Sequence, residues 1–219
     1  MMEIKLLQTG VLGVNTLIVP CGKDRCFVVD PAACSLSHDE NCITDYLKKN
    51  HLECTAVILT HTHFDHITGI DKIKKEFPSA KICVHEAEFA ELMNAPGPMN
   101  VNVTEDCGAS IVLEQVSKQP CAELSLKGDA SLNSFIPSIE GDWKIIHTPG
   151  HSPGSICLYS KEQNILIAGD TIFSSGGFGR TDLYGGDFNA LKKSLMLLKQ
   201  TIPQNTLVFS GHGPSFYFE

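Results

Sequence analysis

The sequence predicts an α/β protein in which strands alternate with helices in both halves of the chain. Short apolar runs rich in Val and Ile recur along it, each bounded by Gly, Pro, Asn or Asp, as is typical of buried strands. Apolar residues at intervals of three and four follow several of these runs, as they do on amphipathic helices. Together the two patterns favour a layered domain with one or two mixed sheets.

The N-terminal third is predicted to contain an antiparallel start and a first helix. A turn signal over 21–24 joins the second and third strands in a hairpin. Ser37 and Glu40 have the spacing of a capping box, so we expect a helix over 38–50 that leads into a buried strand over 56–59. The three strands that precede this helix are predicted over residues 4–7, 14–19 and 26–29.

The middle of the chain continues the alternation and then loses it. Apolar residues at helical spacing predict a helix over 67–77, which Pro78 ends before a strand over 81–84 and a short helix over 85–93. The stretch 94–110 is rich in Pro, Gly and Asn and shows no period, so we expect a long surface loop. Loops of this kind often border functional sites.

The second half repeats the strand and helix pattern. A helix over 187–200 carries an apolar stripe, while Lys192, Lys193 and Lys199 face water. Because no linker-like segment divides the chain, we expect a single domain over residues 1–219. The stripe consists of Phe188, Leu191, Leu195 and Leu198. The strands are predicted over residues 143–147, 155–159, 165–168 and 206–209.

Composition excludes several classes of protein. A chain of 219 residues can bury roughly 70% of its unfolded surface, so it needs neither disulfides nor a metal merely to fold. The 25 acidic residues outnumber the 17 basic ones, and the net charge of -8 argues against a nucleic-acid partner. Nine cysteines without a C-x-x-C pair, and no signal-like or membrane-spanning run, lead us to expect a cytoplasmic protein without membrane insertion.

The densest group of potential metal ligands directly follows the strand over 56–59. His61, His63, Asp65 and His66 lie within six residues. Residues two apart in an extended backbone point the same way, so His61 and His63 form a first chelating pair. The turn that follows can direct Asp65 and His66, the second pair, to a neighbouring point, and one segment can then serve two metal ions. The alternative is a merely polar or pH-sensitive loop, although this spacing seldom arises by chance.

Further candidates follow later strands. His151 lies in a loop stiffened by Pro and Gly and completes a three-histidine set with the first pair; three protein ligands plus water are typical of catalytic zinc. Asp170 is placed to bridge two cations, and His212, between two glycines, to join the second pair. For Asp170 and His212 a turn or capping role is an equal alternative. We expect His147 to be structural.

These motifs resemble those of the metallo-β-lactamase superfamily, and specifically of its short glyoxalase II-like (hydroxyacylglutathione hydrolase-like) members. The resemblance covers nearly the whole chain, through THTHFDH at 60–66, TPGHS at 148–152, AGDT at 168–171 and SGHGP at 210–214. It implies a four-layer αβ/βα sandwich with two mixed β-sheets and a dinuclear site at one edge. It also implies that one metal ion binds His61, His63 and His151, that the other binds Asp65, His66 and His212, and that Asp170 bridges them.

Other features bear on the substrate. The chain ends shortly after His212, so the C-terminal helical domain that contributes to glutathione recognition in full-length glyoxalase II is expected to be absent. Arg180 lies in a segment similar to the short bacterial relatives, where related enzymes place a basic substrate-contacting residue; pairing with Asp182 is the equal alternative. Metallo-β-lactamases proper are disfavoured, because one subclass needs Cys in place of Asp170 and another usually lacks that aspartate.

The expected reaction is hydrolysis of a thioester of a small thiol, S-lactoylglutathione or a similar compound. A bound cation lowers the pKa of water to about 7, and two cations can hold the hydroxide while they polarise the carbonyl. We therefore expect two divalent metal ions, Zn first and Fe or Mn as alternatives, with catalytic roles for Asp65 and Asp170. Asn15 and Asp30 are weaker candidates to orient the imidazoles through their second nitrogen.

The same motifs are compatible with two other functions. A persulfide dioxygenase branch of the superfamily also carries a Gly-Arg-Thr-Asp segment, here at 179–182, but binds a single iron through two histidines and an aspartate. A metal-storing or regulatory protein would bind metal without turnover. The oligomeric state is left open by the sequence.

Overall fold

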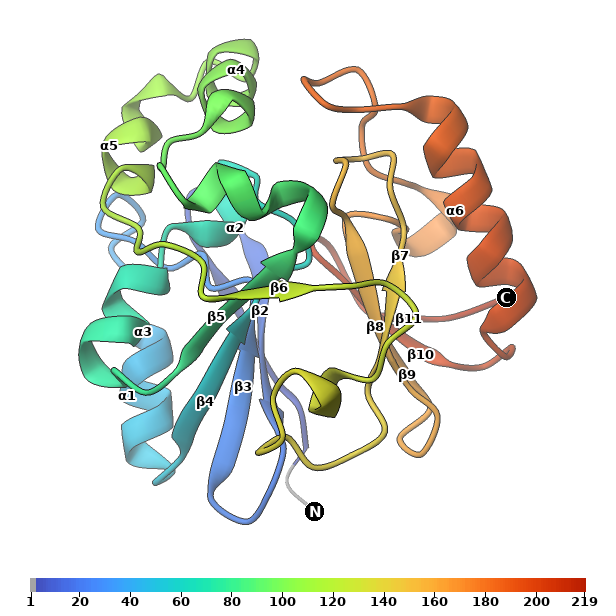
Figure 1. The fold of residues 1–219 in the computed structure, drawn as a ribbon, viewed down its shortest axis with the longest axis horizontal. Helices are drawn as coiled ribbons and strands as arrows, with labels where there is room; N and C mark the ends of the chain where they lie inside the picture. The colour runs from blue at the N-terminus through green and yellow to red at the C-terminus, as the bar shows by residue number, and fades with distance from the viewer. Residues whose placement is uncertain (1–2) are drawn as a thin grey trace.

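The computed structural model describes residues 3–219 as two β-sheets packed face to face, with helices on both outer sides (Figure 1). One sheet has the strand order β1-β2-β3-β4-β5-β6 and the other the order β11-β10-β9-β8-β7. Each sheet contains both parallel and antiparallel pairs. The predicted α/β class and four-layer sandwich are confirmed.

The six-stranded sheet is antiparallel at one side and parallel at the other. β1, β2 and β3 pair antiparallel, with the predicted turn between β2 and β3, whereas β3 to β6 pair in parallel. The last strand, β6, was not predicted, because three residues are too few to show a period. The bounds are β1 Lys5–Thr9, β2 Val14–Pro20, β3 Arg25–Val29, β4 Glu53–Ile58, β5 Lys81–His85 and β6 Leu124–Leu126.

The second sheet is built from the C-terminal half of the chain. β7, β8 and β9 pair antiparallel in sequence, β10 adds in parallel to β9, and β11 adds antiparallel to β10. It follows that β7, β9 and β10 all run in the same direction. The bounds are β7 Lys144–His147, β8 Ile156–Ser160, β9 Ile165–Gly169, β10 Leu207–Ser210 and β11 Phe216–Tyr217.

The helices lie mainly over the outer faces of the sheets. Those that follow the early strands cover the six-stranded sheet, and α6 covers the other (Figure 1). The α-helices are α1 Cys42–Lys49, α2 Phe64–Ile67, α3 Ile70–Glu76, α4 Pro98–Asp106, α5 Leu113–Val116 and α6 Phe188–Thr201. The 3₁₀ segments are η1 Glu86–Leu92, η2 Ser110–Val112, η3 Leu132–Ser134 and η4 Ser174–Gly176.

Two helix predictions near the start of the chain were wrong in their bounds. The first helix begins at Cys42 rather than 38, because the Ser37 hydroxyl donates to the Cys34 carbonyl and to Asp39 instead of capping a helix. The helix predicted over 67–77 is divided into α2 and α3 at Gly69, whose N–H donates to the carbonyl of Pro31. This hydrogen bond holds the junction between α2 and α3 against the segment that follows β3.

The prediction of a long loop over 94–110 was also wrong. The segment contains α4, which begins at Pro98, a residue favoured in the first helical turn because it has no N–H to leave unpaired. Met99 and Val103 on this helix are buried in the core on the outer side of the six-stranded sheet. Asn-rich composition concealed a helix that tertiary packing stabilises.

Alternation along the strands explains the layers. Cys26 and Val28 of β3 pack toward the helices, while Phe27 and Val29 point into the space between the sheets. The ring of Phe27 meets that of Trp143 edge to face, with centroids 5.7 Å apart. The sheets are thus joined by an apolar core that holds their strand ends in fixed positions.

The predicted stripe on α6 is confirmed only in part. Leu191 and Leu198 are buried and Leu195 is half-buried, but the Phe188 side chain is 55% exposed. Ser194 takes a place on the buried face instead, and its hydroxyl donates to the carbonyl of Pro149. The helix is therefore linked directly to the loop that carries His151.

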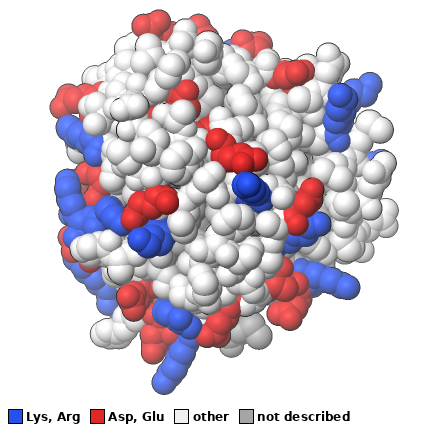
Figure 2. All heavy atoms as spheres, viewed as in Figure 1, with Lys and Arg blue, Asp and Glu red and all other residues white. Residues whose placement is uncertain are grey.

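The surface carries both signs of charge. Figure 2 shows basic and acidic side chains interspersed over one face of the molecule. Several of them pair, as Lys74 does with Glu123 at 2.7 Å, although exposed pairs of this kind contribute little to stability. Among residues 3–219, no helix combines the length and apolarity needed to cross a bilayer.

Candidate metal centre

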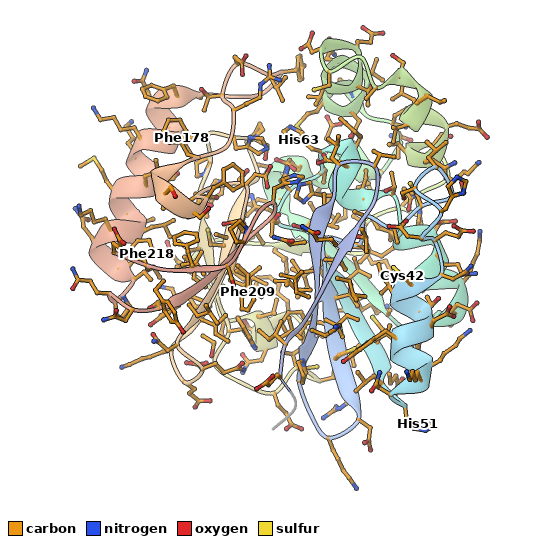
Figure 3. The ribbon with its side chains drawn as sticks, turned by 180° about the vertical axis from the view of Figure 1, so that it is seen from behind. Cys42, His51, His63, Phe178, Phe209 and Phe218 are labelled. Atoms are coloured by element: carbon orange, nitrogen blue, oxygen red, sulfur yellow. The ribbon has the colours of Figure 1, made fainter. Side chains whose placement is uncertain are left out.

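The seven predicted ligands converge at one edge of the sandwich. β3 and β4 run parallel in one sheet, and β7, β9 and β10 share a direction in the other, so the segments after them meet at the same edge. Figure 3 shows His63 between the ends of the two sheets, with Phe178 on the side of α6. The seven residues are His61, His63, Asp65, His66, His151, Asp170 and His212.

A first group consists of His61, His63 and His151. One nitrogen from each lies within 4.8 Å of the others, and all three side chains are buried. Burial, together with the neighbouring imidazoles, holds the pKa of His61 and of His63 well below the usual histidine value. These rings are therefore neutral at physiological pH and can offer a lone pair to a cation.

A second group consists of Asp65, His66 and His212, again with ligand atoms within 4.8 Å of one another. Asp65 Oδ2 lies 3.3 Å from His212 Nε2 and 3.6 Å from His66 Nε2. Burial alone would raise the pKa of Asp65, but the charges of His66 and His212 and a hydrogen bond from His212 lower it overall. Burial also opposes protonation of His66, yet three nearby carboxylates raise its pKa to about 10. The group thus concentrates negative charge that a proton or a metal cation can neutralise.

Asp170 faces both groups. Its Oδ2 lies 3.6 Å from His151 Nε2 and 3.6 Å from His212 Nε2, and its Oδ1 lies 3.6 Å from His66 Nε2. None of these separations is a good hydrogen bond, since N–H···O bonds centre near 2.9 Å. The Asp170 carboxylate therefore lies between the two groups. Its separation of 3.6 Å from each imidazole nitrogen leaves space for a cation bound by both atoms.

The donor atoms fit divalent cations. Within residues 3–219, Nε2 of His61, His63, His66 and His151 and Oδ1 of Asp170 are buried without a hydrogen-bond partner. Such orphaned groups are rare because burying them unpaired costs free energy, and several aimed at one point indicate a missing common partner. Imidazole and carboxylate ligands suit Zn, Fe and Mn alike, so the chemistry indicates divalent metal ions without selecting one.

Hydrogen bonds behind the ligands set which ring nitrogen faces the centre. Nδ1 of His66 donates to Asp30 at 3.0 Å, and Asp30 also accepts from the backbone and hydroxyl of Thr60. Nδ1 of His61 in turn donates to the Thr60 hydroxyl at 3.1 Å, and Nδ1 of His151 to the Arg180 carbonyl at 2.8 Å. With Nδ1 occupied in this way, Nε2 is left to bind a cation.

The two weaker candidates behave differently. Asp30 accepts a hydrogen bond from Nδ1 of His66, the ring nitrogen that does not face the centre, as expected. Asn15 does not touch a ring; its Nδ2 donates to the carbonyls of Ser210 and Gly213 at 3.0 and 2.7 Å. It thereby braces the loop that carries His212. His147 has a structural position, stacked on His85 with its Nε2 bonded to the carbonyl of Pro153.

Arg180 forms an ion pair with Asp182, which was the alternative to a substrate-contacting role. Its guanidinium donates two parallel hydrogen bonds of 2.9 Å to Asp182, and its side chain is 58% exposed. The backbone of this segment is close to the centre, since a Cβ on Gly179 would lie 2.7 Å from His151 Nδ1. The backbone of Arg180 therefore lies beside His151, while its exposed guanidinium is partly neutralised by Asp182.

Sequence reasoning missed two buried polar residues beside the first group. Glu88 accepts hydrogen bonds from Thr62 and Gly154, and Asn100 donates to the Thr62 carbonyl. Neither stands in a motif, and both lie in segments that were interpreted only as a short helix or a loop. Glu88 is one of three glutamates in the segment 86–92, and nothing in the sequence distinguishes it from the other two.

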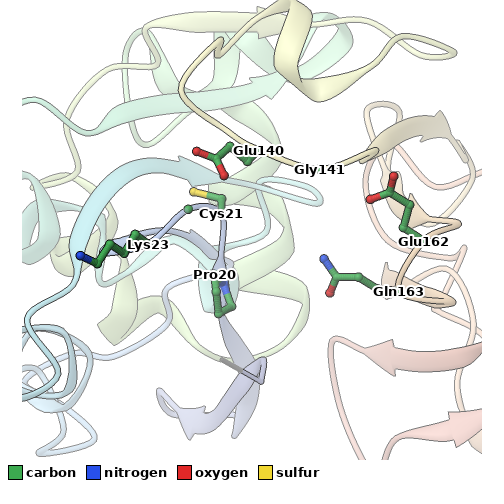
Figure 4. Close-up of a pocket in the computed structure, with 8 residues that line it drawn as sticks. Pro20, Cys21, Lys23, Glu140, Gly141, Glu162 and Gln163 are labelled. Carbon is green, nitrogen blue, oxygen red and sulfur yellow. The ribbon is translucent and has the colours of Figure 1, made fainter. Parts of the chain in front are cut away.

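A separate hollow lies at the opposite end of the strands (Figure 4). It is formed by the β2–β3 turn and the β8–β9 turn, with Cys21, Lys23 and Glu140 among its lining residues. No group of metal-ligand type was found there within the described part of the chain. The groups of metal-ligand type found among residues 3–219 lie at the other edge of the sandwich.

The fold and the clustered ligands define a metal-dependent hydrolase. Residues 9–212 match the family model described as the metallo-beta-lactamase superfamily, and the chain belongs to this superfamily. Among characterised and uncharacterised relatives, it is 35% identical over 214 residues to the "Probable metallo-hydrolase YqgX" of Bacillus subtilis, a match that covers 97% of this chain and 91% of the relative.

Two further similarities bear on activity. The chain is 30% identical over 188 residues to the hydroxyacylglutathione hydrolase of Klebsiella pneumoniae, covering 86% of this chain and 57% of that enzyme. The solved structure of BLEG-1, described as a B3 metallo-beta-lactamase, superposes with a TM-score of 0.80 at 29% identity and covers 98% of this chain and 94% of that one. One superfamily thus includes similar proteins with different stated activities.

Proposed function

We propose that this protein hydrolyses thioesters of small thiols, S-lactoylglutathione or a similar compound, at a centre of two divalent metal ions. The observation that carries the proposal is the arrangement of two three-ligand groups that share Asp170. We assign His61, His63 and His151 to one ion and Asp65, His66 and His212 to the other. When bound, the ions would lower the pKa of a water molecule to about 7 and polarise the scissile carbonyl.

The protein's own residues would position and desolvate the reacting groups. Asp65 uses one oxygen toward His66 and His212, which leaves its other oxygen to accept a proton from the nucleophile. Asp170 would fix the separation of the ions. A thioester suits such a site, because a thiolate leaves without a strong general acid to protonate it.

The side chains next to Gly179 suit a substrate with an apolar part and an anionic part. The rings of Phe178 and Phe188 pair with centroids 6.1 Å apart and are both largely exposed, and Phe178 adjoins Gly179 at the centre. Arg180 follows on the same segment and carries the positive charge. The aromatic pair would contact the acyl or alkyl part and Arg180 a carboxylate of the thiol.

The direct test is a panel of thioesters, with a β-lactam and a phosphodiester as comparison substrates, assayed with metal analysis of the same preparation. We expect thioester turnover that is lost with a chelator and restored by Zn²⁺, Fe²⁺ or Mn²⁺. Chelator-insensitive turnover would reject metal-dependent hydrolysis. Turnover of the β-lactam alone would reject the thioester assignment while keeping the metal centre.

Replacing Arg180 with Ala is expected to raise KM for an anionic thioester about threefold to tenfold and to leave kcat nearly unchanged. The effect is modest because the guanidinium is exposed and shared with Asp182. Asp182→Asn should have the opposite effect on KM, since it frees the arginine. Steady-state kinetics decide the question, with Lys192→Ala on the exposed face of α6 as the control. Identical kinetics for all variants would remove Arg180 from the site.

The second candidate is a persulfide dioxygenase, which the Gly-Arg-Thr-Asp segment at 179–182 favours. It would need a single iron, whereas ligand-type residues occupy every position of both groups. Oxygen consumption with glutathione persulfide, together with one iron per chain, would replace the hydrolase proposal with this one.

A further inference from the structure

A buried carboxylate joins two of the loops that carry the first group of histidines. Glu88, in η1, is 1% exposed. Its Oε2 accepts from the N–H of Thr62 at 2.7 Å and from the Thr62 hydroxyl at 2.8 Å, and its Oε1 accepts from the N–H of Gly154 at 2.7 Å. All three donors are uncharged, so the carboxylate is buried without a countercharge among its hydrogen-bond partners.

The contacts fall on the two segments that must be aligned to bring three histidines together. Thr62 lies between His61 and His63, and its carbonyl accepts from Asn100 at 2.8 Å, so every polar group of this residue is held. Gly154 belongs to the loop of His151. A Cβ on Gly154 would lie 2.8 Å from Cγ of Glu88, which shows how closely the loop approaches the carboxylate.

A neutral side chain would not serve equally well. Hydrogen bonds to an ionised carboxylate are shorter and stronger than those between neutral groups, and only a carboxylate offers two acceptor oxygens to donors on opposite sides. Burying such a charge is costly unless it is satisfied. A protein that needed only to close the core at this point would not require an acid.

We propose that Glu88 is a positioning residue for the first metal ion, because it fixes the loops of His61, His63 and His151 relative to one another. This inference rests on the metal centre proposed above. The hydrogen bonds of Glu88 are made to Thr62 and Gly154 rather than to the ligand atoms, so it acts through these two residues. Groups that orient metal ligands in this way typically change metal affinity by about 10- to 100-fold when removed.

The test is Glu88→Gln in the full chain. The amide keeps the shape but has one acceptor oxygen, so its NH₂ group must face a donor from one of the two loops. We expect affinity for Zn²⁺, measured by competition with a chromophoric chelator, to fall about 10- to 100-fold at the site of His61, His63 and His151. The visible absorption of the Co²⁺-loaded protein should shift. In the metal-free protein, hydrogen exchange at the Thr62 and Gly154 amides should become faster.

Asp142→Asn is the matched control. Asp142 also accepts from two backbone N–H groups and a hydroxyl, those of Lys161, Glu162 and Ser160, but at the opposite end of β8. Its amide variant should lower stability without changing Zn²⁺ affinity or the Co²⁺ spectrum. Unchanged affinity in Glu88→Gln, or an equal loss in Asp142→Asn, would overturn the proposal.

A milder variant covers the case in which Glu88→Gln does not fold. Thr62→Val keeps the side-chain shape and removes one of the three contacts, so Zn²⁺ affinity should fall about threefold to tenfold. Wild-type affinity in that variant would equally contradict the role of Glu88. No measurement uses a substrate, so a result against thioester hydrolysis and a result against Glu88 are distinguishable.

Discussion

Asp170→Asn is expected to lower the metal content from two ions to one or fewer per chain and to reduce hydrolysis by more than about 100-fold. The substitution keeps size and shape but replaces a charge that lies 3.6 Å from imidazole nitrogens of both groups. Loss of a residue that only orients a ligand costs up to about 100-fold, and loss of a carboxylate that faces both ligand groups should exceed that limit. Elemental analysis after gel filtration, paired with thioester assays, measures both effects.

The affinity of the metal ion that remains, measured by Zn²⁺ competition, distinguishes a carboxylate shared by both groups from one that serves a single group. If Asp170 served only one group, the variant would retain the other ion at full affinity and lose a single equivalent without a change in the second. Two retained ions with wild-type turnover would contradict any role of Asp170 at the centre. Asp142→Asn again supplies the control, since it makes the same chemical change far from this edge.

Most of the strands were predictable because they are buried on both sides. β9 and the second half of β4 are continuous apolar runs, and their ends locate the edge where the ligand-type residues meet. β6 and β11 have three and two residues and show no pattern of their own. β6 and β11 form by hydrogen bonding to a neighbouring strand, β5 and β10 respectively. A short stretch of sequence does not show that such a neighbour will be present. α4 was missed for a related reason, since its buried residues are chosen by the shape of the core.

The residues of the candidate site also differ in whether a local sequence pattern predicts them. The seven ligand-type residues stand in short motifs directly after strands, so their meeting could be anticipated from the topology of α/β sheets. Glu88 could not, because its partners Thr62 and Gly154 are 26 and 66 residues away in the chain. Arg180 was left with two interpretations, and the structure gives it the Asp182 partner. Residues that support ligands are specified by tertiary contacts and leave little trace in the sequence.

Gly211→Ala is expected to abolish tight metal binding while the protein still folds. A Cβ at this position would lie 2.1 Å from Oδ1 of Asp170 and 2.8 Å from Cε1 of His66. The methyl group must therefore displace the carboxylate, the imidazole or both, and such overpacking costs about 1 to 3 kcal/mol. Circular dichroism and urea unfolding would test the fold, and Zn²⁺ competition the centre, where we expect a loss greater than about 100-fold.

Gly213→Ala separates this steric effect from backbone strain, because Gly213 has a φ of +76° but no atom within 4 Å of an added Cβ. It should cost about 1 to 2 kcal/mol of stability through the left-handed backbone and leave metal affinity close to wild type. The two variants, on either side of His212, should therefore lose similar stability but differ widely in metal affinity. If Gly211→Ala bound Zn²⁺ as tightly as Gly213→Ala, the carboxylate of Asp170 would have room to move aside, and its place between the two groups would not be what holds the ions.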